Sequence, residues 1–126
     1  MDISVALSRI VPAVIHPAVS QGAGAFVSAT GVDLQGYEGV INAVVSTGAI
    51  TGTLSLQRLQ DSDAIGGAYV DIAGQLAVAD ITTANQVRTL PQDTRSCRRF
   101  LKFAATVTTG PILMAVTLIG FKKYAA

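Results

Sequence analysis

Polar and apolar residues alternate most clearly over residues 53–57, where apolar side chains recur at every second position. This period of two is typical of a strand with one buried face. Leu59 then falls one position out of phase, which predicts either a bulge near Arg58 or a change of the buried face. Alternation returns over residues 68–72 after a run of turn residues, so we expect a hairpin across residues 61–67.

Three further segments have the composition of strands. Residues 37–46 are almost continuously apolar, which is typical of a strand buried on both faces, with a buried helix as the competing interpretation. Residues 99–108 and 112–124 are expected to form two strands joined by a turn at Gly110, and the odd-numbered residues of the first are expected to face the core. In the remaining central region, only residues 81–87 are compatible with a helical turn.

The first 20 residues contain Pro12 and Pro17, which donate no backbone hydrogen bond. This segment therefore suits an edge strand or an extended N-terminal arm that lies along a neighbouring molecule. Its apolar side chains are the candidate contacts with that neighbour, namely Ile10, Val11, Val14 and Ile15.

Short strands separated by frequent turns indicate an all-β fold of two packed antiparallel sheets. We predict a β-sandwich of the jelly-roll type with about seven or eight strands. The sandwich domain is expected over residues 21–126, preceded by the arm or edge strand of residues 1–20.

The composition favours one folded domain that associates with other molecules. Half of the 126 residues are apolar and only 13% are charged, which excludes a disordered chain. Because so much apolar surface does not fit into one small core, we expect part of it to be buried in contacts between copies. The longest uncharged stretch, residues 103–121, is interrupted by threonine, glycine and proline, so no membrane span is expected.

Candidate catalytic residues are few. His16 is the only histidine and Cys97 the only cysteine, so neither a disulfide nor a cysteine–histidine metal site can be assembled. The arginines beside Cys97 are expected to lower its pKa, although a structural role is favoured for this residue. Asp61 and Asp63 are interpreted as solvated turn residues rather than calcium ligands. We therefore expect no enzymatic activity and no cofactor.

The charge is unevenly distributed, with a net negative first half and a net positive second half. The cations of residues 88–102 could form a patch that docks on an acidic protein surface, or a solvated strand edge. Nucleic acid is not expected as the partner, because the net charge is only +1 and no aromatic stacking platform accompanies the cations. The candidate residues of this patch are Arg88, Arg95, Arg98, Arg99 and Lys102.

Several short motifs resemble, in order and spacing, small structural proteins encoded in the head gene clusters of tailed bacteriophages. The resemblance covers roughly residues 30–124, but the N-terminal 20 residues and the C-terminal strand that ends in FKKY at residues 121–124 have no matching pattern. The motifs are TGVDLQGYE at residues 30–38, LQDSD at 59–63, a double glycine at 66–67, YVDI at 69–72, RRFLK at 98–102 and VTTG at 107–110.

This resemblance implies a virion protein that decorates the capsid and cements it by bridging subunits of the major capsid protein. It also implies self-association, commonly as a homotrimer, on the outer surface of the shell after synthesis in the host cytoplasm. One alternative is a head–tail connector or tail protein, which would form rings. Another is a carbohydrate-binding β-sandwich module, although the chain has no tryptophan and only three tyrosines to present to a sugar.

Overall fold

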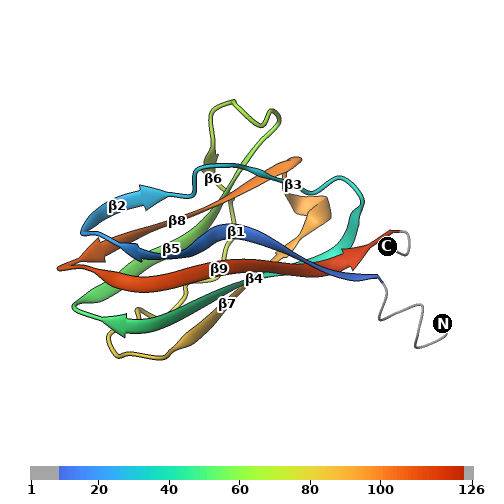
Figure 1. The fold of residues 1–126 in the computed structure, drawn as a ribbon. Helices are drawn as coiled ribbons and strands as arrows, with labels where there is room; N and C mark the ends of the chain where they lie inside the picture. Colours follow the sequence, from blue (N-terminus) through green and yellow to red (C-terminus); the bar gives the residue numbers. More distant parts are fainter. Residues whose placement is uncertain (1–8, 124–126) are drawn as a thin grey trace.

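The computed structural model describes residues 9–123, which form two antiparallel sheets packed face to face (Figure 1). The predicted all-β antiparallel sandwich is confirmed. The described elements are β1 (Ile10–Gln21), β2 (Gly24–Val27), β3 (Val32–Asp33), β4 (Tyr37–Ile50), β5 (Thr53–Ser62), β6 (Val70–Asp71), β7 (Val87–Asp93), the 3-10 turn η1 (Thr94–Ser96), β8 (Phe100–Thr108) and β9 (Ile112–Lys122).

The strand order is that of a jelly roll. One sheet has the order β1-β9-β4-β7 and the other β2-β8-β5-β6, with the short β3 beside β8. Apart from β3, the strands pair from the two ends of the sequence toward its middle: β1 with β9, β2 with β8, β4 with β7 and β5 with β6. A long antiparallel ribbon wound into two sheets gives this pattern, which joins distant parts of the chain side by side.

The core lies between the two sheets and takes alternate residues from each strand. In β8, the odd-numbered residues from Leu101 to Val107 are at most 2% exposed, as predicted. In β4, Ile41 and Val45 are fully buried, whereas Val40, directly before Ile41, is 53% exposed. The prediction that this segment is buried on both faces was therefore wrong, because the second face of β4 is the outer face of its sheet.

The predicted bulge in β5 is present. Ser55 pairs with Thr106 and Arg58 with Ala104, so one extra residue is inserted in β5. Leu56 adopts a φ of 54° at this point, and its side chain is 66% exposed. Because of the inserted residue, Leu59 points into the core. This explains why Leu59 is out of phase with Leu54 and Leu56 in the sequence.

The predicted hairpin after β5 is also present, but its second strand is short. Gln60 pairs with Asp71, and the strand β6 ends there instead of extending over residues 68–72. Beyond it, the side-chain amide of Gln75 takes the place of a backbone partner. Its Oε1 accepts from the Leu59 amide at 2.7 Å, and its Nε2 donates to the Leu59 carbonyl at 2.7 Å.

No helical turn forms at residues 81–87, where one was compatible with the sequence. Ile81 is fully buried and forms an antiparallel bridge with Leu54, while Asn85 has a φ of 58° that ends any helical path. The next residues form β7, a strand that the sequence pattern did not indicate because Pro91 interrupts it. Over residues 9–123, no helix is long and apolar enough to cross a membrane.

The N-terminal segment is an edge strand over its described part. Residues 10–21 pair with β9, with irregularities on both sides of His16, next to Pro17. The domain boundary expected at residue 20 thus falls inside β1, a strand of the sandwich itself. Residues 1–8, the rest of the expected arm, lie outside the described residues, as does Tyr124 at the end of the last predicted strand.

Candidate interaction surfaces

Three of the five candidate cations lie around one shallow hollow at the end of the sandwich where both described chain ends lie (Figure 1). Arg95 comes from η1, and Arg98 and Arg99 come from the segment that leads into β8. Lys123 and Glu38 also line the hollow, which has a volume of about 500 Å³. We call this feature the cationic hollow, because four of its lining residues carry positive charge and one carries negative charge.

Arg98 is the most firmly held of these cations. Its backbone amide donates to Asp61 Oδ2 at 2.8 Å, its Nε to Asp61 Oδ1 at 3.1 Å and its Nη2 to the Asp61 carbonyl at 2.8 Å. Asp61 is buried, so this carboxylate depends on Arg98 for its compensation. The pair fixes the start of β8 to the end of β5, which leaves Arg98 a structural role.

Arg99 and Arg95 are paired at the surface. Arg99 forms a two-pronged contact with Asp33, at 3.0 and 2.8 Å, and this hydrogen-bonded pair lowers the pKa of Asp33 to about 2. Asp93 accepts from the Arg95 amide at 2.9 Å and so caps η1, and the Arg95 side chain lowers the pKa of Asp93. The Arg95 side chain is nonetheless 84% exposed, which makes it more accessible than Arg98 or Arg99.

The other two candidate cations lie elsewhere, so the five do not form one patch. Arg88 belongs to β7 and donates to the carbonyls of Ala79 and Val87. Lys102 belongs to β8, with its Nζ 4.4 Å from the ring centre of Tyr69. Both side chains are therefore engaged in contacts within the chain.

Cys97 also lines the cationic hollow, but its expected activation is wrong. Burial and, to a smaller extent, the charges of Asp61 and Asp93 together raise the pKa of the Cys97 thiol to about 11. Arg95 and Arg98 are paired with these same carboxylates and Arg99 is paired with Asp33, so the three arginines do not act on the thiol as free cations. The thiol therefore stays protonated at neutral pH and is a poor nucleophile.

His16 is a buried side chain of β1. Its Nε2 lies 3.1 Å from Gln21 Oε1, and its ring centre lies 5.2 Å from that of Phe26. Burial lowers the pKa of the imidazole. Among residues 9–123, no three histidine, cysteine, aspartate or glutamate side chains gather in a group that could hold a metal ion.

The motifs that carry the sequence resemblance contact one another in the fold. Gln60 Nε2 donates to Asp71 Oδ1 at 2.8 Å, joining two of the motifs. A Cβ atom at Gly31 would overlap the hydroxyl of Tyr69, so a larger residue there requires the Tyr69 ring to move. Together with the Arg98–Asp61 pair, these contacts explain the motifs as determinants of the fold.

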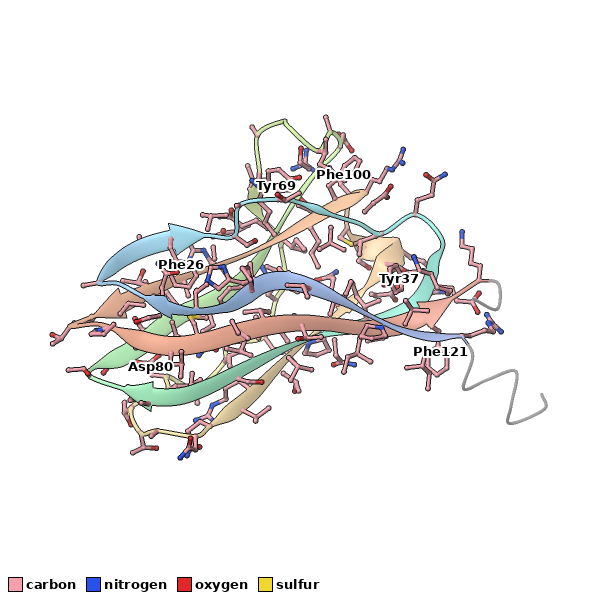
Figure 2. All side chains as sticks on the ribbon, in the orientation of Figure 1. Phe26, Tyr37, Tyr69, Asp80, Phe100 and Phe121 are labelled. Carbon is pink, nitrogen blue, oxygen red and sulfur yellow. The ribbon has the colours of Figure 1, made fainter. Side chains whose placement is uncertain are left out.

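The second candidate surface is the outer face of the sheet β1-β9-β4-β7. Residues on neighbouring strands align in rows across it, such as Val14, Thr117, Val44 and Thr89. Figure 2 shows Phe121 projecting away from the opposite sheet. Seven of the twelve large apolar side chains that are exposed among the described residues belong to this sheet: Ile10, Val14, Val40, Val87, Leu113, Ile119 and Phe121.

This surface carries no charge over most of its area. Of the described residues on it, the charged ones lie at the end near the cationic hollow. Glu38 and Asp93 are in register with Phe121 and Val40, and they form ion pairs with Arg9 and Arg95. We call the remainder the uncharged face. The opposite sheet differs, because its outer side carries Arg58 and other charged or polar side chains.

The four N-terminal candidate contacts divide between the two sides of β1. Ile10 and Val14 are exposed on the uncharged face, as a contact role requires. Val11 is half-buried and packs against the core, and Ile15 is only 4% exposed. Ile15 is therefore a core residue, because the irregular pairing beside it turns consecutive side chains inward.

Most of the uncharged face was missed by reasoning from the sequence. The signal was present in residues 103–121, which carry no charge, but it had been used only to ask whether the chain crosses a membrane. Recognising it required the register of β9 against β1 and β4. Alternate residues of β9 point outward, and the neighbouring strands add uncharged residues on both sides.

No protein-family model matches the chain, and no curated protein matches it significantly. Its function is therefore argued from its two surfaces and from the motif resemblance, since a jelly roll serves many unrelated functions.

Proposed function

We propose that the chain is a structural protein of a tailed-bacteriophage virion, which decorates the capsid shell and cements it by bridging major capsid protein subunits. The observation that carries this proposal is the uncharged face of the sheet β1-β9-β4-β7, which suits a protein that associates with further copies of itself in an assembly. Exposed apolar surfaces of this extent on small proteins mark sites of contact with other proteins. The role is structural rather than catalytic, and the partners are the capsid protein and further copies of this chain.

In this proposal, the cationic hollow is the surface that contacts the shell. Arg95 and Lys123 lie at its rim, and an acidic surface of the capsid lattice would complement them. Because these side chains are paired or solvated, the contact contributes orientation and specificity more than affinity. Its strength should fall as salt screens the charges.

Stabilisation of the shell follows from mass action. A protein that binds the assembled lattice, and not the free capsid subunits, lowers the free energy of the lattice by its own binding free energy. A rigid sandwich suits this role, because little conformational entropy is lost when it binds. The complex then resides on the outer surface of the virion, after synthesis of the protein in the host cytoplasm.

Co-sedimentation tests this proposal. The purified protein is mixed with empty shells of the major capsid protein from the same phage, and the pelleted amount is measured as its concentration rises. We expect saturation at a fixed ratio to the capsid subunit and a higher melting temperature of the shells. Protein that stays in the supernatant contradicts the proposal, and rings seen by electron microscopy without shells would indicate a connector or tail component.

A further inference from the structure

We propose that the uncharged face is covered by the same face of a second copy, in a pair with two-fold symmetry. The pair goes beyond the role on the shell and does not depend on it, because it can be observed in the purified protein alone. The argument rests on the size of the face, on where its charges lie and on the lack of another suitable surface among the described residues.

The face is large enough for a stable pair. Four strands about 4.8 Å apart and roughly 30 Å long give about 550 Å² per copy and about 1,100 Å² per pair. Specific interfaces between proteins bury upwards of about 1,000 Å² in total. Two sheets packed this way resemble the interior of a sandwich, where facing sheets lie about 10 Å apart.

The charges fix the direction of the two-fold axis. Glu38 and Asp93 lie at the same end of the face and are paired with Arg9 and Arg95, so an arrangement that brought like ends together would remove four ion pairs from water, which is costly. A two-fold axis that runs across the strands, along the row through Thr117 and Val44, places these ends at opposite extremes of the pair. The uncharged centres of the two faces then meet without charge repulsion.

Other surfaces of the described chain offer no equivalent contact. Of the five other large apolar side chains that are exposed, Leu56 and Leu76 line a groove that also carries Arg58, Asp71 and Asp80, and the other three lie outside this groove: Val27, Ile65 and Val70. Pairing through sheet edges is also disfavoured, since prolines interrupt both edge strands of this sheet, β1 and β7. A second copy therefore meets its best complement in the same uncharged face.

The mass of the protein in solution, measured by light scattering, tests the pair. The wild type is expected at twice the chain mass of 13.0 kDa. Ile119→Lys places a charge in the middle of the face, beside Pro12 and Asn42, and should raise the dissociation constant at least about 100-fold. Leu76→Lys is the matched control, because Leu76 is equally apolar and 79% exposed but lies outside the face, and it should remain a dimer.

Circular dichroism shows whether Ile119→Lys is folded, and Val44→Asp replaces it if it is not. Cross-linking then tests the axis in a Cys97→Ser background. Thr117→Cys should link to its copy through a short bis-maleimide, whereas Phe121→Cys should not, because the two copies of that position lie at opposite ends of the pair.

Three results would overturn the pair. The first is a wild-type protein that stays monomeric at about 100 µM, which would leave the face to the shell or to residues 1–8 of its own chain. The second is a trimer or a ring. The third is a folded face variant that keeps the wild-type mass. A monomeric Ile119→Lys protein that still binds shells would separate this pair from the proposed function.

Discussion

The guanidinium and backbone amide of Arg98 surround the buried carboxylate of Asp61, which joins the opening of β8 to the end of β5. Arg98 was a candidate for a partner-binding patch, yet it binds Asp61. The interpretation of Asp61 as a solvated turn residue was wrong, because its side chain is buried against Arg98. Basic residues at the start of a strand can thus stabilise the fold instead of binding a partner. Surfaces for partners then have to be sought where side chains have no partner within the chain.

Asp61→Asn should lower the free energy of unfolding by about 2–3 kcal/mol, because charge-assisted hydrogen bonds in a buried site are lost. Asp63→Asn is the matched control. Asp63 lies 3.6 Å from the same guanidinium, but its side chain is 81% exposed, so its loss should change stability by less than about 0.5 kcal/mol. Urea unfolding of both variants measures the difference, and equal effects would contradict a structural role for Asp61.

Stability should fall at acidic pH through the Asp33–Arg99 pair. The pKa of Asp33 is about 2 in the folded chain, below its ordinary value of 3.8. A lowered pKa contributes stability that is present above the unfolded value and is lost as the pH falls toward 2. Thermal melts between pH 5 and 2 should show this loss, and Asp33→Asn should reduce its slope. An unchanged slope would exclude the pair as a cause.

His16 should add a second pH dependence at higher pH. Burial lowers its pKa from 6.5, so the unfolded chain binds a proton that the folded chain resists. Stability is therefore complete above about pH 6.5 and declines as the pH falls below it. His16→Gln, which does not titrate, should melt at the same temperature at pH 7 and pH 5.5. A variant that keeps the wild-type decline would contradict this assignment.

Gln75→Ala should loosen the outer edge of β5. The side-chain amide of Gln75 accepts from the Leu59 amide and shares the Leu59 carbonyl with the Ile72 amide, so alanine leaves the Leu59 amide without its partner. We expect a loss of about 1–3 kcal/mol and faster hydrogen exchange at the Leu59 amide. Gln35→Ala is a suitable control, because Gln35 is exposed and should change neither quantity.

Arg95→Glu should weaken binding to the capsid shell about tenfold and flatten its dependence on salt, because the charge of the most exposed arginine of the hollow is reversed. Arg88→Glu carries the same change in net charge on β7, away from the hollow, and should bind like the wild type. Sedimentation at two salt concentrations distinguishes them. Equal weakening by both variants would mean that only net charge matters.

Local patterns in the sequence predicted much of the fold. Alternation indicated the buried face of β8, and the phase of Leu59 indicated the bulge in β5, because both depend on neighbouring residues. β7 was missed because Pro91 breaks its pattern, and the tie between Gln75 and Leu59 spans a loop that no periodicity describes.

The surfaces were harder to predict, because they depend on strand order. Arg88 and Arg95 are close in sequence, yet they lie on different parts of the molecule, since β7 ends between them. The uncharged face likewise combines four strands from both halves of the chain, and only their register shows that Val14 and Val44 lie in one row.

The most direct test of the proposed function is electron cryomicroscopy of capsid shells with and without the protein. We predict additional density on the outer surface, at a fixed number of copies per capsid subunit, with the cationic hollow toward the lattice. Shells that remain bare at saturating protein concentration would contradict the proposal that this chain decorates the capsid.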